Sequence, residues 1–484
     1  MDNLANYKYE SIAYDLTQLI ESGTFRPGDR IPSVRQMSKR RNVSVTTVLH
    51  AYYKLEAQGL IRARPYSGFY VRTDLPVGLS EPDVSSPRPD PTTIGVRQLA
   101  MMVVRDEQNP DLVQFGLAHP GADLLPAAKL NRAVRTVLRE RNAHLYDYTP
   151  GCEDLRQQIA RRALAAGCKL TAKDIVLTSG CSEAISLAMR TVCEPGDTVA
   201  IESPMCFDAL QGLQLLGLRA LEIPTHPRDG ISLSALREAI TQNEVSACLV
   251  VSNFNNPLGS SIPDEKKREL VRLLTRHEIP LIENDIFGEI YFGDKRPSVA
   301  KAYDEQELVI LCSSFSKVLC PGYRLGWVVP GRFAERLRWV KYSTNLATPT
   351  VTGFAISEFI RSGGYNTHLR RIRRAYAERL AAMSQSIRRA FPPSTKLTRP
   401  AGGYLLWVEL PGGVDSLELY KRALEAGIAI LPGYLFSASG LYHHFIRLNA
   451  ASWSEEVEWA VERLGSLVDE LAGRPPKPST TPHT

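Results

Sequence analysis

The sequence contains no run of about 20 consecutive apolar residues, the length that a membrane-spanning helix requires. Its first ten residues, MDNLANYKYE, lack the basic start and apolar stretch of a secretory signal, so none is predicted. The eight cysteines show no C-x-x-C spacing, which argues against a zinc site, and they are too few among 484 residues to form a disulfide framework. We therefore predict free thiols, no metal site and a cytoplasmic protein.

The charge of the chain is unevenly distributed. Residues 1–73 carry eleven Lys or Arg and six Asp or Glu, a net charge of +5, whereas the whole chain carries +6. The overall composition, 44% hydrophobic and 23% charged, is that of a globular protein. A small basic module therefore precedes a large and nearly neutral body, and such a module is either a nucleic-acid binder or simply a solvated surface.

The chain divides into four parts. Residues 1–73 show short helical patterns and a strand-like end. Residues 74–93 hold five prolines, and we expect 74–109 to form an extended linker. Between 110 and 472, apolar β-rich runs such as DIVLTSG, TVAIESP and LVILCSSFSK alternate with helical stretches, which predicts a mainly parallel sheet covered by helices. The Pro-rich tail, 473–484, is expected to be disordered.

The front module reads as helix, short helix, turn, helix and β-hairpin, which is a winged helix-turn-helix. Ser33 is placed to cap the short helix and Ser44 the third helix. The hairpin is the run LIRARPYSGFYVR, with its turn at Pro65–Gly68. The residues expected on the inward side of the third helix are Val45, Val48, Leu49, Tyr52 and Leu55.

This module resembles the GntR-type DNA-binding domain in its run SGTFRPGDRIPSVR, in TVLHAYYKLEAQGLI and in SGFYV. The start of the third helix offers hydroxyl and N–H groups to phosphates and base edges, and basic residues lie just before it. The alternative is a basic module that binds another protein. The resemblance implies DNA contacts from Arg35, Ser44, Val45, Thr46, Thr47, Ser67 and Gly68.

In the large body, Lys317 follows the buried-strand pattern LVILCSSFS, and the run Pro321–Gly326 (PGYRLG) comes directly after it. Desolvation at such a strand end lowers the pKa of an amine toward that of a nucleophile suited to Schiff-base chemistry. The spacing Ser314-x-x-Lys317 also fits penicillin-binding enzymes, but their S-D-N and K-T-G motifs are absent.

Lys317 is not the only motif in the body that suits a cofactor site. Thr178–Glu183 lies at a strand-to-helix transition that suits a phosphate, and Asn253–Gly259 (NFNNPLG) and Glu283–Asp285 each follow a strand. In this chain order the segments resemble the fold-type I pyridoxal-phosphate enzymes, the class I/II aminotransferases, over about 110–470. The expected fold is thus an N-terminal winged helix-turn-helix followed by an α/β aminotransferase-like domain with a mixed, mainly parallel sheet and a smaller C-terminal α+β part.

The resemblance implies a role for each matching residue. Lys317 would hold pyridoxal 5'-phosphate covalently, and Arg447 would clamp a substrate α-carboxylate, although its alternative role is a strand-end salt bridge. Tyr146 would reach the phosphate of a neighbouring subunit. Ring contacts would come from Phe207, by stacking, and from Asn256 at the ring hydroxyl. The phosphate cup would consist of Ser179, Gly180, Cys181, Ser182, Ser314, Ser316 and Arg324.

One segment departs from the family pattern, which is E-D-D/E-x-Y. Here Asn284 occupies the position of the carboxylate that keeps the pyridine nitrogen protonated, and Phe287 the position of a tyrosine. Asp285 would take the role only if the strand end shifted by one residue, which strand alternation disfavours. We therefore expect a cofactor pocket with a weakened electron sink.

A GntR-type module joined to an aminotransferase-like body resembles the MocR subfamily of bacterial regulators. The resemblance implies a homodimer that binds a double-stranded DNA operator and senses an amino compound or the cofactor itself. Two alternatives stay open at this point. One is a working aminotransferase with a DNA-binding domain, and the other is a plain DNA binder with an inert body.

Overall fold

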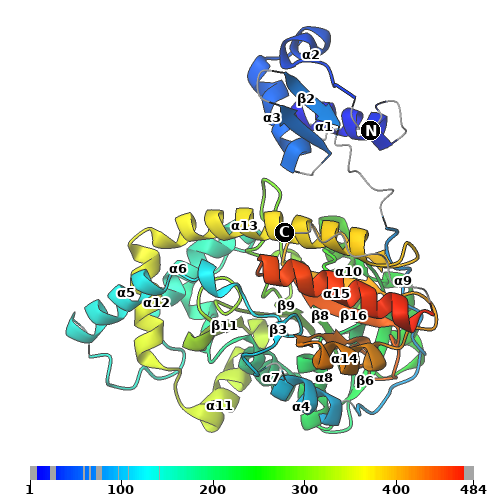
Figure 1. Cartoon of the computed structure of the whole chain (residues 1–484). Coiled ribbons are helices and arrows are strands. Elements are labelled where there is room, and N and C mark those ends of the chain that lie inside the picture. The colour runs from blue at the N-terminus through cyan, green and yellow to red at the C-terminus, as the bar shows by residue number, and fades with distance from the viewer. Residues whose placement is uncertain are drawn as a thin grey trace. The chain divides into compact units, whose positions relative to one another are not determined.

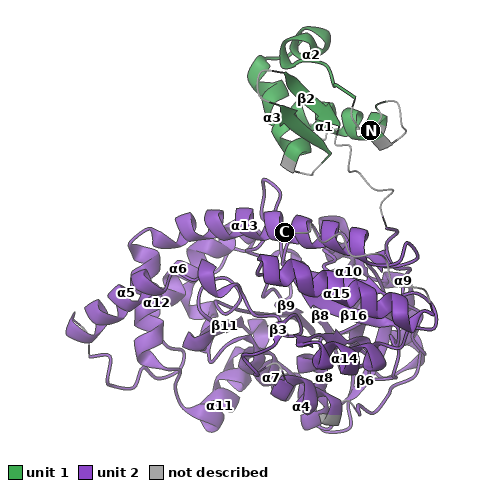
Figure 2. Ribbon diagram, viewed as in Figure 1, with its two compact units in different colours: residues 1–78 green, residues 79–484 purple. Residues whose placement is uncertain are grey.

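A computed structural model divides the chain into two compact units, residues 1–78 and 79–484 (Figure 2). Unit 1 has a hydrophobic core of its own, separate from those of unit 2. Residues 474–484 of the expected tail and 74–78 of the expected linker lie outside the described residues. The structure describes residues 8–21, 25, 29–57, 60–64, 67–71, 79–95, 97–106, 108–140 and 142–473.

Unit 1 has the elements of a winged helix-turn-helix. Ser33 and Gln36 form a capping box at the start of the second helix, as the sequence predicts. Val45, the first residue of the third helix, is 46% exposed and so does not take the inward position that the sequence predicts. The elements are α1 (Lys8–Glu21), α2 (Val34–Arg41), α3 (Val45–Ala57), β1 (Ile61–Arg64) and β2 (Gly68–Val71).

Unit 2 is built around an eight-stranded sheet with the order β4-β11-β10-β9-β8-β5-β6-β7. The sheet is mixed: β11 is antiparallel to both of its neighbours and β7 to β6, whereas the strands from β10 to β6 run parallel. The strands are β4 (Val176–Thr178), β5 (Thr198–Ser203), β6 (Arg219–His226), β7 (Gly230–Ile231), β8 (Ala247–Val250), β9 (Leu281–Asn284), β10 (Val309–Ser314) and β11 (Gly326–Val329).

Helices cover both faces of this sheet, as Figure 1 shows. Along β5, Val199 and Ile201 pack with residues of α7 and α8, whereas Ala200 between them packs with residues of α9 and α10. Successive side chains of a strand point to opposite faces, so each apolar run fills two cores. The helices of this part are α5 (Ala127–Glu140), α6 (Glu153–Ala163), α7 (Cys181–Val192), α8 (Phe207–Leu215), α9 (Leu233–Gln242), α10 (Asp264–Arg276), α11 (Ala334–Asn345) and α12 (Thr350–Arg361).

A smaller C-terminal part contains a four-stranded sheet with the order β12-β13-β16-β15. The long helix α13 packs against α15 beside it (Figure 1). None of the described helices is both long and apolar enough to cross a membrane. The elements are α4 (Arg97–Asp106), α13 (Gly364–Ala390), α14 (Ser416–Glu425), α15 (Glu455–Leu471), β12 (Lys396–Leu397), β13 (Leu405–Glu409), β15 (Leu431–Pro432), β16 (Phe445–Asn449) and the parallel pair β3 (Val113–Gln114) and β14 (Ile428–Ala429).

Residues 79–95, expected to belong to an extended linker, are instead part of unit 2. The Ser85 hydroxyl donates to Ser203 O (2.6 Å) and accepts from Thr225 N (2.9 Å). Thr92 pairs with Ala220 at the edge of the sheet. The segment is extended, as its prolines favour, but its polar groups bind the body rather than water. The following residues, 97–106, form α4.

Candidate cofactor site and DNA-binding surface

Lys317 lies just beyond the end of β10, the central strand next to β9. Its side chain is half-buried, and Nζ donates a hydrogen bond to Ala118 O over 2.7 Å. Burial lowers the pKa of the Lys317 ammonium below its ordinary value, while the Asp208 carboxylate acts in the opposite direction. A lowered pKa raises the fraction of neutral amine, which is the nucleophilic form. The structure therefore gives Lys317 the environment that the sequence predicts.

The predicted phosphate cup is brought together at the start of α7. Gly180 has φ +94, and a Cβ there would lie 2.6 Å from Nη2 of Arg324, so the close approach requires glycine. Arg324 donates to Ser179 O and to Ser316 Oγ, both over 3.3 Å. α7 begins at Cys181, and the N–H groups of its first turn have no partner within the helix. Free N–H groups beside a guanidinium form a site for a dianion.

The remaining residues of the predicted cup lie at its edge. The Ser182 side chain is exposed on the first turn of α7. The Ser314 hydroxyl is buried and accepts a hydrogen bond from Ser316 N over 3.2 Å. It therefore orders the backbone just before Lys317.

Sequence reasoning missed a contact that holds the cup loop. Glu183 accepts a hydrogen bond from Ser179 N and forms an ion pair with Lys341 of α11 (3.1 Å). The two charged residues are 158 positions apart, and no local motif connects them. This pair connects the cup loop to α11.

Arg447, predicted to bind a substrate carboxylate, lies in contact with Asn256, predicted to bind the ring hydroxyl of the cofactor. Nη1 of Arg447 donates to Oδ1 of Asn256 over 2.9 Å, and Nη2 donates to Gly116 O. Arg447 is only 1% exposed, and these two contacts go to an amide and a carbonyl rather than to a carboxylate. They therefore do not support the alternative role, a strand-end salt bridge.

Phe207, expected to stack on the cofactor ring, is 3% exposed and packs in a core cluster with Leu79 and Leu258. The preceding residue, Cys206, is half-buried, and its Sγ accepts a hydrogen bond from Nδ2 of Asn256 (3.1 Å). The thiol thus contacts the polar residue Asn256, whereas the side chain of Phe207 packs in the core. Sequence reasoning selected the aromatic residue because stacking favours a flat ring.

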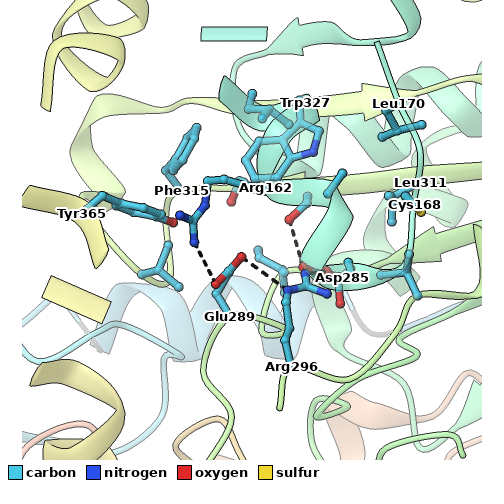
Figure 3. Close-up of a pocket in the computed structure, with 18 residues that line it drawn as sticks. Arg162, Cys168, Leu170, Asp285, Glu289, Arg296, Leu311, Phe315, Trp327 and Tyr365 are labelled. Atoms are coloured by element: carbon cyan, nitrogen blue, oxygen red, sulfur yellow. Dashed lines mark hydrogen bonds and ion pairs between the residues drawn. The ribbon is translucent and has the colours of Figure 1, made fainter. Parts of the chain in front are cut away.

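Asn284 and Asp285 point to opposite faces of the sheet. Oδ1 of Asn284 lies 3.4 Å from Sγ of Cys181, at the cup. The Asp285 carboxylate accepts from Nδ2 of Asn253 (2.9 Å) and pairs with Arg296 (2.5 Å). Figure 3 shows Asp285 pointing to Arg296 in a cavity of about 40 Å³. Glu289 continues the chain of charges in this cavity, because it pairs with both Arg296 and Arg162.

Phe287 is fully buried and packs edge to face against Tyr404, with 5.4 Å between ring centroids. The Tyr404 hydroxyl donates to Ala118 O (3.1 Å), the same carbonyl that accepts from Lys317. The phenyl ring of Phe287 supplies no hydrogen-bond donor. Position 287 therefore supplies no hydroxyl, whereas the family pattern has a tyrosine there.

Tyr146 is 70% exposed in the loop after α5, and its ring packs against Tyr148 (5.6 Å between centroids). Within one chain, the Tyr146 ring contacts Tyr148 and is otherwise mostly exposed to solvent. The exposed position is compatible with the expected contact to a second subunit.

On unit 1, the residues predicted to contact DNA lie at the start of α2, at the start of α3 and in the hairpin turn. Arg35 and Thr46 are exposed, and no described residue pairs with Arg35. The Ser44 hydroxyl caps α3 by accepting from Thr47 N over 3.0 Å. In the hairpin, Gly68 has φ +114, and Ser67 Oγ lies 2.7 Å from the Tyr70 hydroxyl. Pro65 and Tyr66 of the expected wing turn lie outside the described residues.

Comparison with known proteins identifies both units. Residues 117–464 match the model of the aminotransferase class I and II family, which covers more than two thirds of the chain. The chain belongs to this family. Residues 8–71 match the bacterial regulatory proteins of the GntR family. The two matches in one chain are the MocR architecture, and the predicted fold class is confirmed.

Relatives share either the whole chain or only the body. YdcR of Escherichia coli K12, an HTH-type transcriptional regulator, is 38% identical over 96% of this chain and 99% of its own. The 2-aminoadipate transaminase of Thermus thermophilus is 30% identical over 75% of this chain and 92% of its own. The crystal structure of LysN, an alpha-aminoadipate aminotransferase from the same bacterium complexed with N-(5'-phosphopyridoxyl)-L-leucine, superposes with a TM-score of 0.72, with 30% identity over 77% of this chain and 95% of LysN.

The residues of this family member fit pyridoxal 5'-phosphate. A positive cup at the start of α7 suits the dianionic phosphate, and Lys317 suits the aldehyde. Asn256, the predicted partner of the ring hydroxyl, contacts Cys206 and Arg447. The fit is incomplete on the side of the ring nitrogen, where Asn284 offers an amide and no charge.

Proposed function

We propose that this chain is a transcriptional regulator that binds an operator in double-stranded DNA through unit 1 and senses an amino compound through pyridoxal 5'-phosphate held by unit 2. The observation that carries the proposal is the combination of an intact lysine and phosphate cup with an amide at the position of the ring-nitrogen partner. Such a pocket binds the cofactor and an amine but stabilises charge on the ring poorly. The free state of the cysteines is compatible with a cytoplasmic location.

Different residues of unit 2 would bind the different groups of the cofactor and of the amino compound. Arg324, Ser316 and the first turn of α7 would hold the phosphate, and Lys317 would hold the aldehyde carbon until an amine displaces it. Arg447 would then bind the carboxylate of the amino compound in a bidentate manner. When bound, the cofactor supplies an electrophilic carbon and an electron-accepting ring. A ligand shifts DNA affinity only if it binds two states of the protein unequally.

We further propose that the chain acts as a homodimer. Tyr146 is exposed in one chain and would reach the phosphate of the second, which would complete each cup. Two copies of α3 would then address repeated half-sites in the operator. Replacement of Tyr146 by Phe is expected to weaken cofactor binding by about fivefold, because it removes one hydrogen bond to phosphate.

The test is Lys317→Ala in the full chain. The variant should lose the visible absorbance of the covalently held cofactor and its labelling by borohydride. The matched control is Lys421→Ala, which removes an exposed lysine of α14 and should change neither. Absorbance and labelling that persist in Lys317→Ala would overturn the assignment. Full turnover with a keto acid, at about 1 to 10³ per second, would favour the working aminotransferase instead.

A further inference from the structure

Asp208 lies on the first turn of α8, on the exposed side of the residues predicted to hold the cofactor, which we call the entrance. Its side chain is exposed, and Oδ2 lies 3.9 Å from Sγ of Cys206. That thiol accepts from Asn256, which in turn accepts from Arg447. A continuous chain of contacts therefore leads from the Asp208 carboxylate to the guanidinium that would bind a ligand carboxylate.

The Asp208 carboxylate lies in the first turn of α8, where it favours the helix N-terminus. No described cationic side chain forms an ion pair with it. Asp208 nevertheless acts on both basic groups of the entrance: its charge opposes the lowering of the pKa of Lys317 and of His119 by burial. Apart from a neighbouring thiol and Lys317 itself, the other groups that act on these two residues are the cations Arg447 and Arg324. Asp208 is thus an unpaired anion among cations.

We propose that Asp208 selects amino compounds that carry a second cationic group, such as a basic amino acid. The inference rests on the proposed function, because the reacting amine must reach the cofactor at Lys317. With the α-carboxylate on Arg447, a ligand side chain directed along the contacts through Asn256 and Cys206 would reach Asp208, which would then pair with an ammonium group. A side-chain carboxylate at the same place faces a like charge.

This proposal predicts a ligand preference that differs from the substrate for which one relative is named. The Thermus thermophilus relative is named for 2-aminoadipate, a compound with a carboxylate at the end of its side chain. L-Lysine has the same kind of unbranched side chain with an ammonium at its end, and L-norleucine has no charge there. These three amino acids isolate the sign of the distal charge as the variable.

The experiment titrates the purified full chain, loaded with pyridoxal 5'-phosphate, with each of the three amino acids and follows the visible absorbance. The expected order of affinity is lysine, norleucine and then 2-aminoadipate, with about a fivefold advantage of lysine over norleucine, since a partly exposed ion pair contributes up to about 1 kcal/mol. The advantage should shrink as salt rises.

Asp208→Asn should abolish the preference for lysine, and Asp208→Lys should reverse it in favour of 2-aminoadipate. The control is Glu305→Gln, an exposed carboxylate before β10 and so at the opposite edge of the sheet, which should keep the wild-type order. Binding of 2-aminoadipate as tight as that of lysine, or a preference unchanged in Asp208→Asn, would overturn the inference alone. Absorbance that no amine changes, in a protein whose Lys317→Ala variant behaves like wild type, would overturn the proposed function and the inference with it.

Discussion

The Asp285 carboxylate pairs with the Arg296 guanidinium over 2.5 Å, on the face of the sheet opposite to Asn284. Because this carboxylate is buried and neutralised by Arg296, it is not free to turn toward the cofactor ring. Strand alternation thus supports the proposal that an amide faces the ring nitrogen. The expected weakening of the electron sink follows from the direction of two neighbouring side chains.

Asn284→Asp should therefore strengthen the chemistry of unit 2. A carboxylate at this position keeps the pyridine nitrogen protonated, so the half-reaction with an amino acid should become at least about tenfold faster, equal to about 1.4 kcal/mol of barrier. Rapid mixing with single-turnover absorbance measures the rate. Asn284→Ala is the control and should give no gain. A rate equal in wild type and Asn284→Asp would show that the ring nitrogen does not depend on residue 284.

The Asp285–Arg296 pair should be important for folding. Asp285→Ala leaves the Arg296 charge buried without this partner and should lower the free energy of unfolding by about 3–5 kcal/mol. The double variant Asp285→Leu, Arg296→Met should recover a large part of that loss, because no charge then remains unpaired. Urea unfolding of the single and double variants measures both values. In the single variant Glu289 remains as a partner of Arg296. Equal losses in the two variants would contradict a dominant role for the buried Arg296 charge.

Local patterns were sufficient for most of the fold. The caps at Ser33 and Ser44, the apolar runs of the sheet and the order of motifs around Lys317 each depend on residues close in sequence. The strand-to-helix turn at Gly180 was predictable for the same reason, since it is a local structure. The opposite directions of Asn284 and Asp285 were predictable because alternation along a strand is a rule of backbone geometry.

Other features depend on contacts between residues that are far apart in the sequence, so no local pattern predicts them. The Glu183–Lys341 pair and the docking of 79–95 on β6 join segments far apart in the chain. Cys206 was overlooked because its neighbour Phe207 offered a flat ring, and only the packing shows that Phe207 belongs to the core. Asp208 carries no motif, so its position beside Cys206 is visible only in three dimensions.

Glu202 of β5 should make stability depend on pH. Its Oε2 accepts from Val251 N and from Asn255, each over 2.7 Å, and burial raises the pKa of its carboxyl to about 7. A carboxyl with a raised pKa stabilises the fold fully below its unfolded pKa of about 4.5, and this stabilisation is lost as pH rises toward 7.

Glu202→Gln removes this proton linkage. Relative to wild type, the variant should gain stability between pH 5 and pH 8, by at most about 3 kcal/mol. Denaturant unfolding at both pH values gives the difference, and Glu305→Gln, on the surface, should show none. If the variant instead lost stability relative to wild type between pH 5 and pH 8, Glu202 would already be ionised in the folded protein at low pH.

Arg35 of α2 should contribute charge rather than sequence selection to DNA binding. It is exposed in the first turn of α2, and no described carboxylate neutralises it. A contact to phosphate releases about one counterion, so Arg35→Ala should weaken binding on specific and non-specific DNA alike and lower the slope of log affinity against log salt by about 1. Thr46→Ala, at the exposed start of α3, is the matched comparison: it should leave the salt slope unchanged and reduce only the preference for the operator. Fluorescence anisotropy at several salt concentrations measures both quantities. A loss of operator preference in Arg35→Ala with an unchanged slope would place this arginine on a base edge instead of a phosphate.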